Sequence, residues 1–229
     1  MTIDHPVVSP EAWQRASLRL REREKELTRL RDELSRERRE LPWERIGKNY
    51  VFDGPNGKEA LGQLFDGRTQ LVVYHFMFPP EWENGCKSCS WWADNFERNV
   101  VHLAHRDVTL VAISHAPLAK LDAFKRRMGW TFKWLSGADG EFSEDFHASS
   151  PPEAKASGEV VYNFRPAISV FYRDGDGAIY HTYSCYARGI EMFNAGYHYL
   201  DIVPKGRDEE GLSYPMAWVH HRDRYDVAG

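Results

Sequence analysis

The first pattern along the chain is a long segment whose apolar residues have helical spacing. Ser9 is a typical N-cap residue, Pro10 suits the first helical position, and no proline or glycine occurs between Pro10 and Pro42. Apolar residues recur in this segment at every seventh position, namely Trp13, Leu20, Leu27, Leu34 and Leu41. The pattern predicts a tail over residues 1–8 and one helix within residues 9–42.

A helix of this length would span roughly 45 Å, which is more than a small domain can cover. The charges between its leucines alternate in sign, which indicates a solvated face with ion pairs and not an arm for nucleic acid. We therefore expect residues 9–42 to form an arm that packs on a second subunit, as in a homodimer, or projects into solvent. A helix lying across its own domain is the alternative.

After Pro42 the pattern changes to that of an α/β domain over residues 43–229. Residues 69–78 are nearly all apolar, which is typical of a central strand buried on both faces. The alternation of strands and helices predicts a parallel core with right-handed crossovers. The expected elements are a strand and turn over 49–57, a short helix to 65, the strand 69–78, a helix over 86–106, a strand over 107–115 and a helix over 117–128.

The second half of the chain adds antiparallel strands. Residues 167–173 and 178–184 flank the turn 174–177 and predict a β-hairpin. Residues 137–164 are polar and are expected to form an insertion or surface loop, with one short helix near Phe142 to Phe146. The stretch from Asp201 has no clear periodicity and is treated as a C-terminal extension. The expected fold is thus a central mixed β-sheet flanked by helices.

Composition narrows the class of protein. The chain has 229 residues, of which 42% are hydrophobic, with 12 Phe, 11 Tyr and 8 Trp to fill a core. The formal net charge of −4 creates no positive field, so we expect no nucleic-acid partner. We find neither an apolar stretch long enough to span a membrane nor a signal-like N-terminus. A cytoplasmic protein without a membrane partner is the expectation.

The strongest chemical signal is the pair Cys86 and Cys89, which lies at the start of the helix that follows the central strand. A helix N-terminus has unpaired N–H groups and about half a positive charge, which favour a thiolate. Residues three apart lie on one helix face, so the two thiols can form a disulfide. We expect Cys86 to be the attacking thiol of a thiol-disulfide oxidoreductase and Cys89 to be the resolving thiol.

Other interpretations of the pair remain. In a peroxiredoxin-like peroxidase, Cys89 would be the attacking thiolate and Cys86 would resolve the sulfenic acid. The pair could also be structural in a non-enzymatic binding or assembly module. Half of a zinc site is disfavoured because a closed site needs four ligands, and Cys185 and the adjacent His220 and His221 do not supply a second pair. Motifs for nucleotides and serine hydrolases are absent, so we expect no cofactor and no metal.

Four further residues lie near the dithiol or in the core. Pro166 precedes the hairpin, where a cis-proline would face the dithiol and leave a backbone edge for an extended substrate, or an ordinary trans-proline would simply start the strand. Trp82 is a candidate for an apolar platform beside the dithiol. We interpret His75, inside the central strand, as a core histidine and Cys185 as a small buried hydrophobe.

Several sequence blocks together resemble a known family. These blocks are Tyr74 to Phe78, Gly85 to Ser90 with both cysteines, Met128 to Trp130, His181 to Ser184, Ala187 to Gly189, Leu200-Asp201 and Pro204 to Glu209. Over nearly its whole length the chain resembles the thioredoxin-like domain-of-unknown-function family 899. The resemblance implies a thioredoxin-like fold in which residues 50–65 form a peroxiredoxin-type lead-in, and a dithiol at Cys86 and Cys89. It implies no established substrate, so a protein or small-molecule disulfide or a peroxide is expected.

Overall fold

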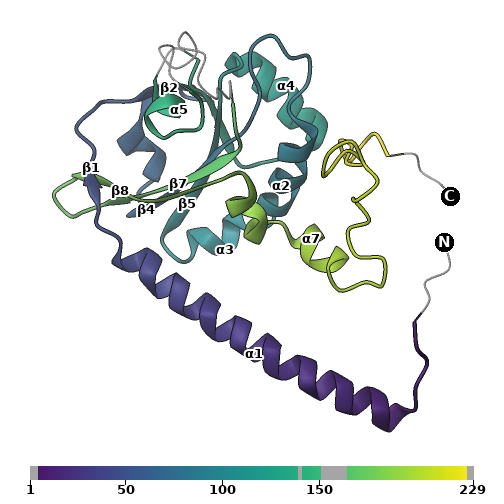
Figure 1. Ribbon diagram of the computed structural model, residues 1–229. Helices are drawn as coiled ribbons and strands as arrows, with labels where there is room; N and C mark the ends of the chain where they lie inside the picture. Colours follow the sequence, from purple (N-terminus) through teal and green to yellow (C-terminus); the bar gives the residue numbers. More distant parts are fainter. Residues whose placement is uncertain (1–4, 139–140, 151–163, 226–229) are drawn as a thin grey trace.

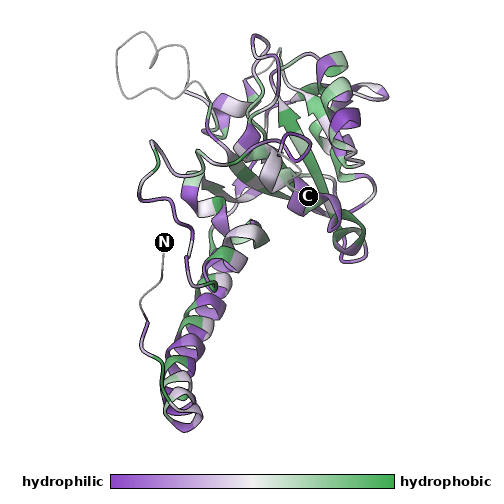
Figure 2. Cartoon of the chain, turned by 90° about the vertical axis from the view of Figure 1, so that its right-hand side faces the viewer, coloured by the Kyte–Doolittle hydropathy of each residue, from purple (hydrophilic) through white to green (hydrophobic). Residues whose placement is uncertain are grey.

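A computed structural model describes residues 5–138, 141–150 and 164–225 of the chain (Figure 1). The helix α1 (Pro10–Glu40) begins at the predicted N-cap, where the Ser9 hydroxyl accepts a hydrogen bond from the Ala12 N–H at 3.3 Å. None of its residues is buried, and it runs away from the domain as a largely hydrophilic rod (Figures 1 and 2). The predicted helix is confirmed, and it does not lie packed across its own domain.

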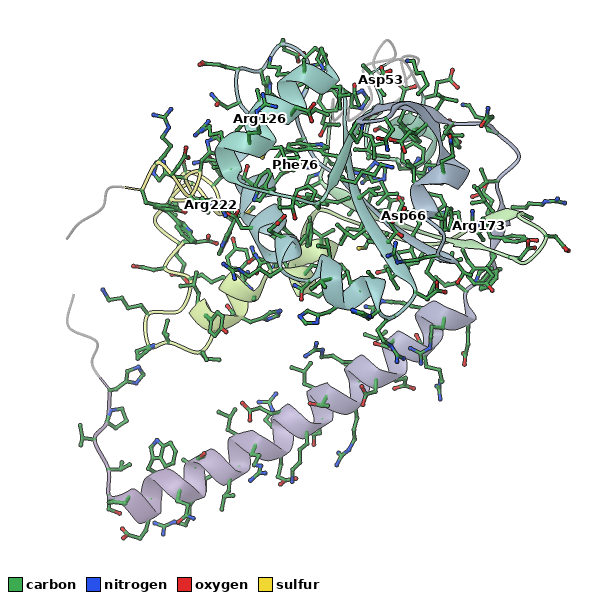
Figure 3. All side chains as sticks on the ribbon, turned by 180° about the vertical axis from the view of Figure 1, so that it is seen from behind. Asp53, Asp66, Phe76, Arg126, Arg173 and Arg222 are labelled. Atoms are coloured by element: carbon green, nitrogen blue, oxygen red, sulfur yellow. The ribbon has the colours of Figure 1, made fainter. Side chains whose placement is uncertain are left out.

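The side chains of α1 project into solvent along its length (Figure 3). Its large apolar residues are all exposed, including Trp13, Leu20, Leu27, Leu30 and Leu34. The arm therefore presents its heptad stripe on the surface of the single chain, and pairing with a second copy stays a prediction.

Among the described residues, eight strands form one mixed sheet in the order β1-β8-β7-β4-β5-β6-β2-β3. The central strand β4 pairs in parallel with β5 and antiparallel with β7. β7 and β8 form the predicted hairpin, with Asp174 accepting hydrogen bonds from the N–H groups of Asp176 and Ala178 in the turn. The strands are β1 (Glu44–Arg45), β2 (Val51–Gly54), β3 (Gly57–Ala60), β4 (Gln70–His75), β5 (Val108–Ser114), β6 (Lys133–Ser136), β7 (Ala167–Arg173) and β8 (Ile179–Tyr186).

Helices cover both faces of this sheet. They are α2 (Lys87–Glu97), α3 (Val100–Ala104), α4 (Leu118–Met128), α5 (Phe142–Asp145), α7 (Ala195–Leu200) and the 3₁₀ helices η1 (Leu61–Phe65) and η2 (Ala187–Phe193). Side chains alternate along β4, so Val73 faces the core cluster under η1 and α5, whereas Tyr74 faces the cluster under α2 and α4. Both side chains are fully buried, which confirms a central strand buried on both faces. Each such side chain contributes roughly 1.5–3 kcal/mol by burial.

Two details differ from the sequence expectations. The helix expected over residues 86–106 is two helices. α2 ends at Glu97 with Arg98 as its C-cap, and the side-chain amide of Asn99 donates to the Asn95 carbonyl at 2.7 Å just before α3 begins. The segment 137–164, expected to be an insertion or surface loop, contains the predicted short helix α5. Phe142 and Phe146 are buried, so the expectation that the segment lies on the surface is wrong for α5. The rest of that segment, residues 151–163, lies outside the described residues.

Candidate dithiol site

The loop between β4 and α2 delivers the dithiol to the end of the sheet. The Cys86 N–H donates to the Met77 carbonyl at 3.1 Å, which ties the start of α2 to the residues just after β4. Gly85 is required at this point, because a Cβ there would lie 2.8 Å from the Phe76 ring. The close approach of loop and strand therefore depends on a residue without a side chain.

Cys86 is the N-cap of α2, as predicted. Its sulfur accepts a hydrogen bond from the Cys89 N–H at 3.4 Å, and its carbonyl accepts from the Ser90 N–H and hydroxyl at 2.9 and 2.8 Å. Cys86 is partly exposed, whereas Cys89 is only 1% exposed. Both thiols are reduced, so this structure contains the dithiol form of the pair.

The environment moves the pKa values of the two thiols apart. The pKa of Cys86 is lowered from 9.0 to about 7, chiefly by a hydrogen bond from the Cys89 thiol and further by the N–H groups of Cys89 and Ser88 and the charge of Lys87. The pKa of Cys89 is raised well above 9.0, chiefly by burial. At neutral pH, a large share of Cys86 is thus ionised, whereas Cys89 keeps its proton.

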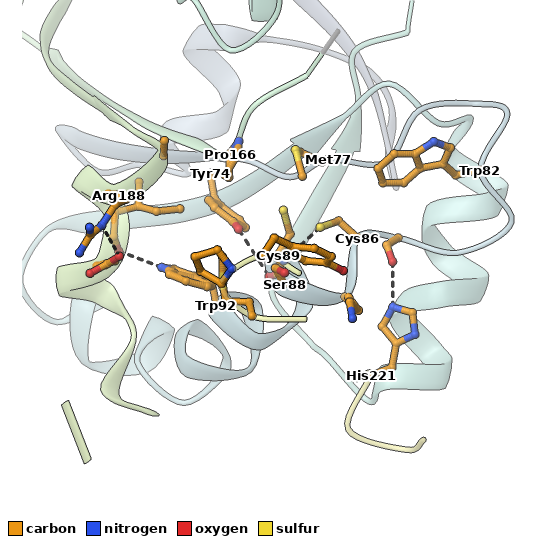
Figure 4. Close-up of a pocket in the computed structure, with 18 residues that line it drawn as sticks. Tyr74, Met77, Trp82, Cys86, Ser88, Cys89, Trp92, Pro166, Arg188 and His221 are labelled. Carbon is orange, nitrogen blue, oxygen red and sulfur yellow. Dashed lines mark hydrogen bonds and ion pairs between the residues drawn. The ribbon is translucent and has the colours of Figure 1, made fainter. Parts of the chain in front are cut away.

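Cys86 and Cys89 lie at the wall of a cavity of about 660 Å³ (Figure 4). Both candidate groove residues, Trp82 and Pro166, line the same cavity, and so does Trp92. Trp82 is 40% exposed at the rim, while Trp92 is buried and donates its indole N–H to the Ile190 carbonyl at 2.8 Å. The structure therefore brings together all four candidate site residues of the sequence analysis.

Pro166 is not in the cis form, because no described peptide bond is cis. Of the two alternatives for Pro166, the cis-proline is wrong, and Pro166 precedes β7 in the ordinary trans geometry. The main-chain groups around it are already used, since the Arg165 N–H donates to the Ala148 carbonyl at 2.8 Å and the Pro166 carbonyl accepts from Ala187 at 3.0 Å. β7 also lies between β4 and β8, so it is not a sheet edge.

The C-terminal extension forms another wall of the cavity, which sequence reasoning missed. Tyr214, Pro215 and Met216 line it, and the following residues attach the extension to α2 and its preceding loop. Lys87 donates to the Ala217 carbonyl at 2.8 Å, and His221 donates to the Gly85 carbonyl at 2.8 Å. The only signal in the sequence was the aromatic composition of this stretch, which does not reveal where it packs.

The Glu209 carboxylate fixes this wall from its other side. It accepts hydrogen bonds from the Met216 N–H at 2.9 Å, the Trp218 indole at 2.7 Å and the Tyr197 hydroxyl at 3.0 Å. Each bond to a charged acceptor contributes roughly 1.5–3 kcal/mol. The residues that line the cavity are therefore held in place from two directions.

The remaining candidates lie apart from the dithiol. His75 is 3% exposed, bonds to the Ser169 hydroxyl at 3.0 Å and stacks on Phe142, which places it on the opposite face of the sheet. Burial lowers its pKa to about 3, so it is a neutral core histidine, as interpreted. Cys185 is 7% exposed in the hydrophobic core, also as interpreted. Across the residues that the structure describes, no group of three or more His, Cys, Asp or Glu side chains could hold a metal ion.

Comparison with known proteins identifies both a family and a fold. A family model described as "Bacterial protein of unknown function (DUF899)" matches residues 2–225. A solved structure of peroxiredoxin Q from Xanthomonas campestris is similar at 13% identity and a TM-score of 0.50, covering 71% of this chain and 97% of that one. Peroxidoxin BcpB from Mycobacterium tuberculosis has 15% identity and a TM-score of 0.48, covering 67% of this chain and 93% of that one. No curated protein matches.

The similarity to peroxiredoxin Q concerns the fold. It confirms the thioredoxin-like α/β architecture that the sequence predicts, with a mixed sheet and flanking helices. In addition, no helix in the described ranges combines the length and the apolar character that a membrane span needs.

Proposed function

Because the chain belongs to the DUF899 family of bacterial proteins and has a thioredoxin-like fold, we propose that it is a thiol-disulfide oxidoreductase that uses Cys86 and Cys89. One observation carries the proposal. The more acidic thiol, Cys86, is partly exposed in a cavity, while the buried thiol, Cys89, lies behind it in the same first helical turn. This division fits an attacking thiol and a resolving thiol.

The reaction proceeds in two displacement steps. The Cys86 thiolate attacks one sulfur of a substrate disulfide, forming a mixed disulfide and releasing the other sulfur as a thiolate. Cys89 then loses its proton and attacks the Cys86 sulfur, which forms the Cys86–Cys89 disulfide and releases the second substrate thiolate. The substrate is reduced by two electrons and the dithiol is oxidised. Turnover needs an external thiol reductant, which reduces the Cys86–Cys89 disulfide by two further exchange steps and is itself released as a disulfide.

The hydrogen bonds of the site suit this sequence of events. As Cys86 enters the mixed disulfide it loses its negative charge, and the Cys89 thiol no longer donates to a thiolate. The proton of Cys89 is then easier to lose, because its raised pKa depends on burial and also on the neighbouring Cys86. The Cys89 N–H, which bonds to Cys86 sulfur in the dithiol form, lies next to the reacting atoms.

Peroxide reduction is the second candidate function, since peroxiredoxins share this fold. In the peroxidase alternative of the sequence analysis, Cys89 was the attacking thiolate. The burial and the raised pKa of Cys89 favour Cys86 as the attacking thiol for this reaction as well. The Cys86 thiolate would take one oxygen from a hydroperoxide, giving Cys86 sulfenic acid and an alcohol after protonation. Cys89 would then form the disulfide and release water. A purely structural dithiol is disfavoured, because Cys86 borders a cavity.

A trapping experiment with a defined disulfide tests the proposal. We expect the reduced Cys89→Ser variant to accumulate a mercaptoethanol adduct on Cys86 when it is treated with 2-hydroxyethyl disulfide. The wild-type protein should pass to an intramolecular disulfide without a lasting adduct, and Cys86→Ser is the matched control. If Cys86 carries no adduct while it still reacts with iodoacetamide, the exchange mechanism is wrong. Sulfenic acid on Cys86 of Cys89→Ser after peroxide treatment would favour the second candidate.

A further inference from the structure

The cavity beside the dithiol also indicates what kind of molecule reaches it. We propose that the cavity takes a small, uncharged disulfide with apolar substituents, in preference to an anionic disulfide or a polypeptide. This inference rests on the proposed oxidoreductase function and names its substrate class. It follows from the shape of the cavity, from the partners of its charged side chains and from the hydrogen bonds around Pro166.

The size and lining of the cavity fit an apolar small molecule. Its volume of about 660 Å³ lies within the range of roughly 300–1,000 Å³ that is typical of ligand pockets. Most of the lining is apolar or aromatic, including Met77, Trp82 and Trp92 (Figure 4). Ile190 and Met216 also belong to it. A molecule that reaches Cys86 would bury apolar surface against these side chains, which favours binding by about 25 cal/mol per Å².

The charged side chains of the lining are already engaged with protein groups. Lys87 donates to the Ala217 carbonyl at 2.8 Å, and Arg188 forms an ion pair with Glu191 at 2.9 Å. Glu191 bonds in addition to Arg207 at 3.2 Å. Of the two cations, Lys87 and Arg188, only Arg188 is paired with a carboxylate among the described residues. An anionic substrate would nevertheless bring its charge into a lining that is mostly apolar, and this transfer from water costs free energy. An uncharged substrate does not meet this cost.

Among the described residues, the backbone beside Pro166 offers no place for an added strand. A polypeptide bound in extended form needs free main-chain N–H and carbonyl groups along a sheet edge. The Arg165 N–H and the Pro166 carbonyl beside the cavity are both bonded within the protein, and β7 is covered on both sides by β4 and β8. The substrate is therefore held by side chains, as expected for a small molecule.

The C-terminal extension supplies the selective wall. Tyr214 lines the cavity and is 51% exposed, so its removal changes the pocket without opening the core. The Lys87 ammonium lies 5.7 Å from the centre of the Tyr214 ring, which orients this ring next to the dithiol. Tyr199 offers a matched control, because it is an exposed tyrosine of the same C-terminal region and does not line the cavity.

The experiment measures single-turnover oxidation of the reduced full-length protein by three disulfides. These are the neutral 4,4′-dithiodipyridine, the dianionic 5,5′-dithiobis(2-nitrobenzoate) and insulin as a polypeptide. Each rate constant is divided by that of free dithiothreitol with the same disulfide at the same pH, which removes the intrinsic reactivity of the probe. High salt screens the net charge of the protein, and Cys86→Ser gives the background.

We expect the normalised rate constant for the neutral disulfide to exceed those for the dianion and for insulin by about tenfold or more. Tyr214→Ala should reduce this preference by about fivefold, and Tyr199→Ala should leave it unchanged. Equal normalised rates, a faster dianion or a faster insulin reaction, with the dithiol fully oxidised in each case, would overturn the substrate class and leave the oxidoreductase function standing. If no probe oxidises the wild-type protein faster than Cys86→Ser, the function itself fails.

Discussion

The difference in pKa between Cys86 and Cys89 predicts how the reactivity of Cys86 should depend on pH. The largest cause of the lowered Cys86 pKa is the hydrogen bond from the Cys89 thiol. Replacing Cys89 by alanine removes this donor, so the pKa of Cys86 should rise from about 7 toward 9.0. Cys89→Ser keeps a hydroxyl donor at the same place and should raise it less. The two variants thus separate the loss of the hydrogen bond from the loss of the sulfur.

The magnitude follows from the two pKa values. At pH 7, a thiol with a pKa of about 7 is half ionised, whereas one with a pKa of 9.0 is about 1% ionised, a difference of about 50-fold in thiolate. A thiolate of lower pKa is less nucleophilic, by about eightfold for two units at a Brønsted coefficient of 0.4–0.5. Cys86 should therefore react about sixfold faster than an ordinary thiol at pH 7, and its rate should level off above pH 8.

The assay is alkylation of the reduced protein by iodoacetamide between pH 5 and pH 10, with the labelled cysteine identified by peptide mass. We expect the wild-type rate at Cys86 to have a midpoint near pH 7, and the Cys89→Ala midpoint to lie clearly higher. Cys89 itself should react slowly because it is buried. A wild-type midpoint near pH 9, or labelling of Cys89 before Cys86, would show that Cys86 is not the more acidic and more reactive thiol.

Three further predictions concern stability and assembly. The pKa of His75 is about 3 in the folded chain against 6.5 when exposed, so the unfolded chain takes the proton first and stability is lost as pH falls below 6.5. Between pH 8 and pH 5, the free energy of unfolding measured in urea should fall by about 2 kcal/mol more for the wild type than for His75→Gln. The same fall in both proteins would contradict this role of His75. Gly196→Ala should cost roughly 1–3 kcal/mol in urea unfolding, since its Cβ would lie 2.3 Å from the Trp91 ring, whereas Gly62→Ala, with 3.7 Å to its nearest neighbour, should cost little. Equal urea midpoints for the Gly196→Ala and Gly62→Ala variants would show that α7 can shift to accept the added Cβ. If the exposed stripe of α1 pairs with a second copy, light scattering should find a dimer for the full chain and a monomer after residues 1–41 are deleted. An unchanged number of subunits would argue against that pairing.

The parts of the fold that the sequence predicts are those with strong local signals. α1 begins directly after its capping residue Ser9. β4 lies within a nearly continuous apolar run, which is typical of a strand buried on both faces. The position of the dithiol is predictable for the same reason, because a Cys-x-x-Cys pair that follows a buried strand is expected at the start of the next helix. The sequence pattern and the fold agree at these positions.

Other features depend on contacts between distant segments. β6 has only four residues, too few for a reliable alternating pattern, and its pairing with β5 decides its conformation. The cavity wall depends on His221 reaching the carbonyl of Gly85, a contact across 136 positions of sequence. The trans geometry of Pro166 is likewise a property of its surroundings and not of the residue. Such features can be found only once the chain is folded.

The most direct test of the proposed exchange chemistry is the reduction potential of the Cys86–Cys89 pair. The pure protein is equilibrated in thiol-disulfide buffers of graded potential, and free thiols are counted by alkylation and mass. We expect a reversible intramolecular couple between roughly −120 and −270 mV, within the span of known dithiol oxidoreductases. If no Cys86–Cys89 disulfide forms at any potential, the proposed exchange chemistry is contradicted.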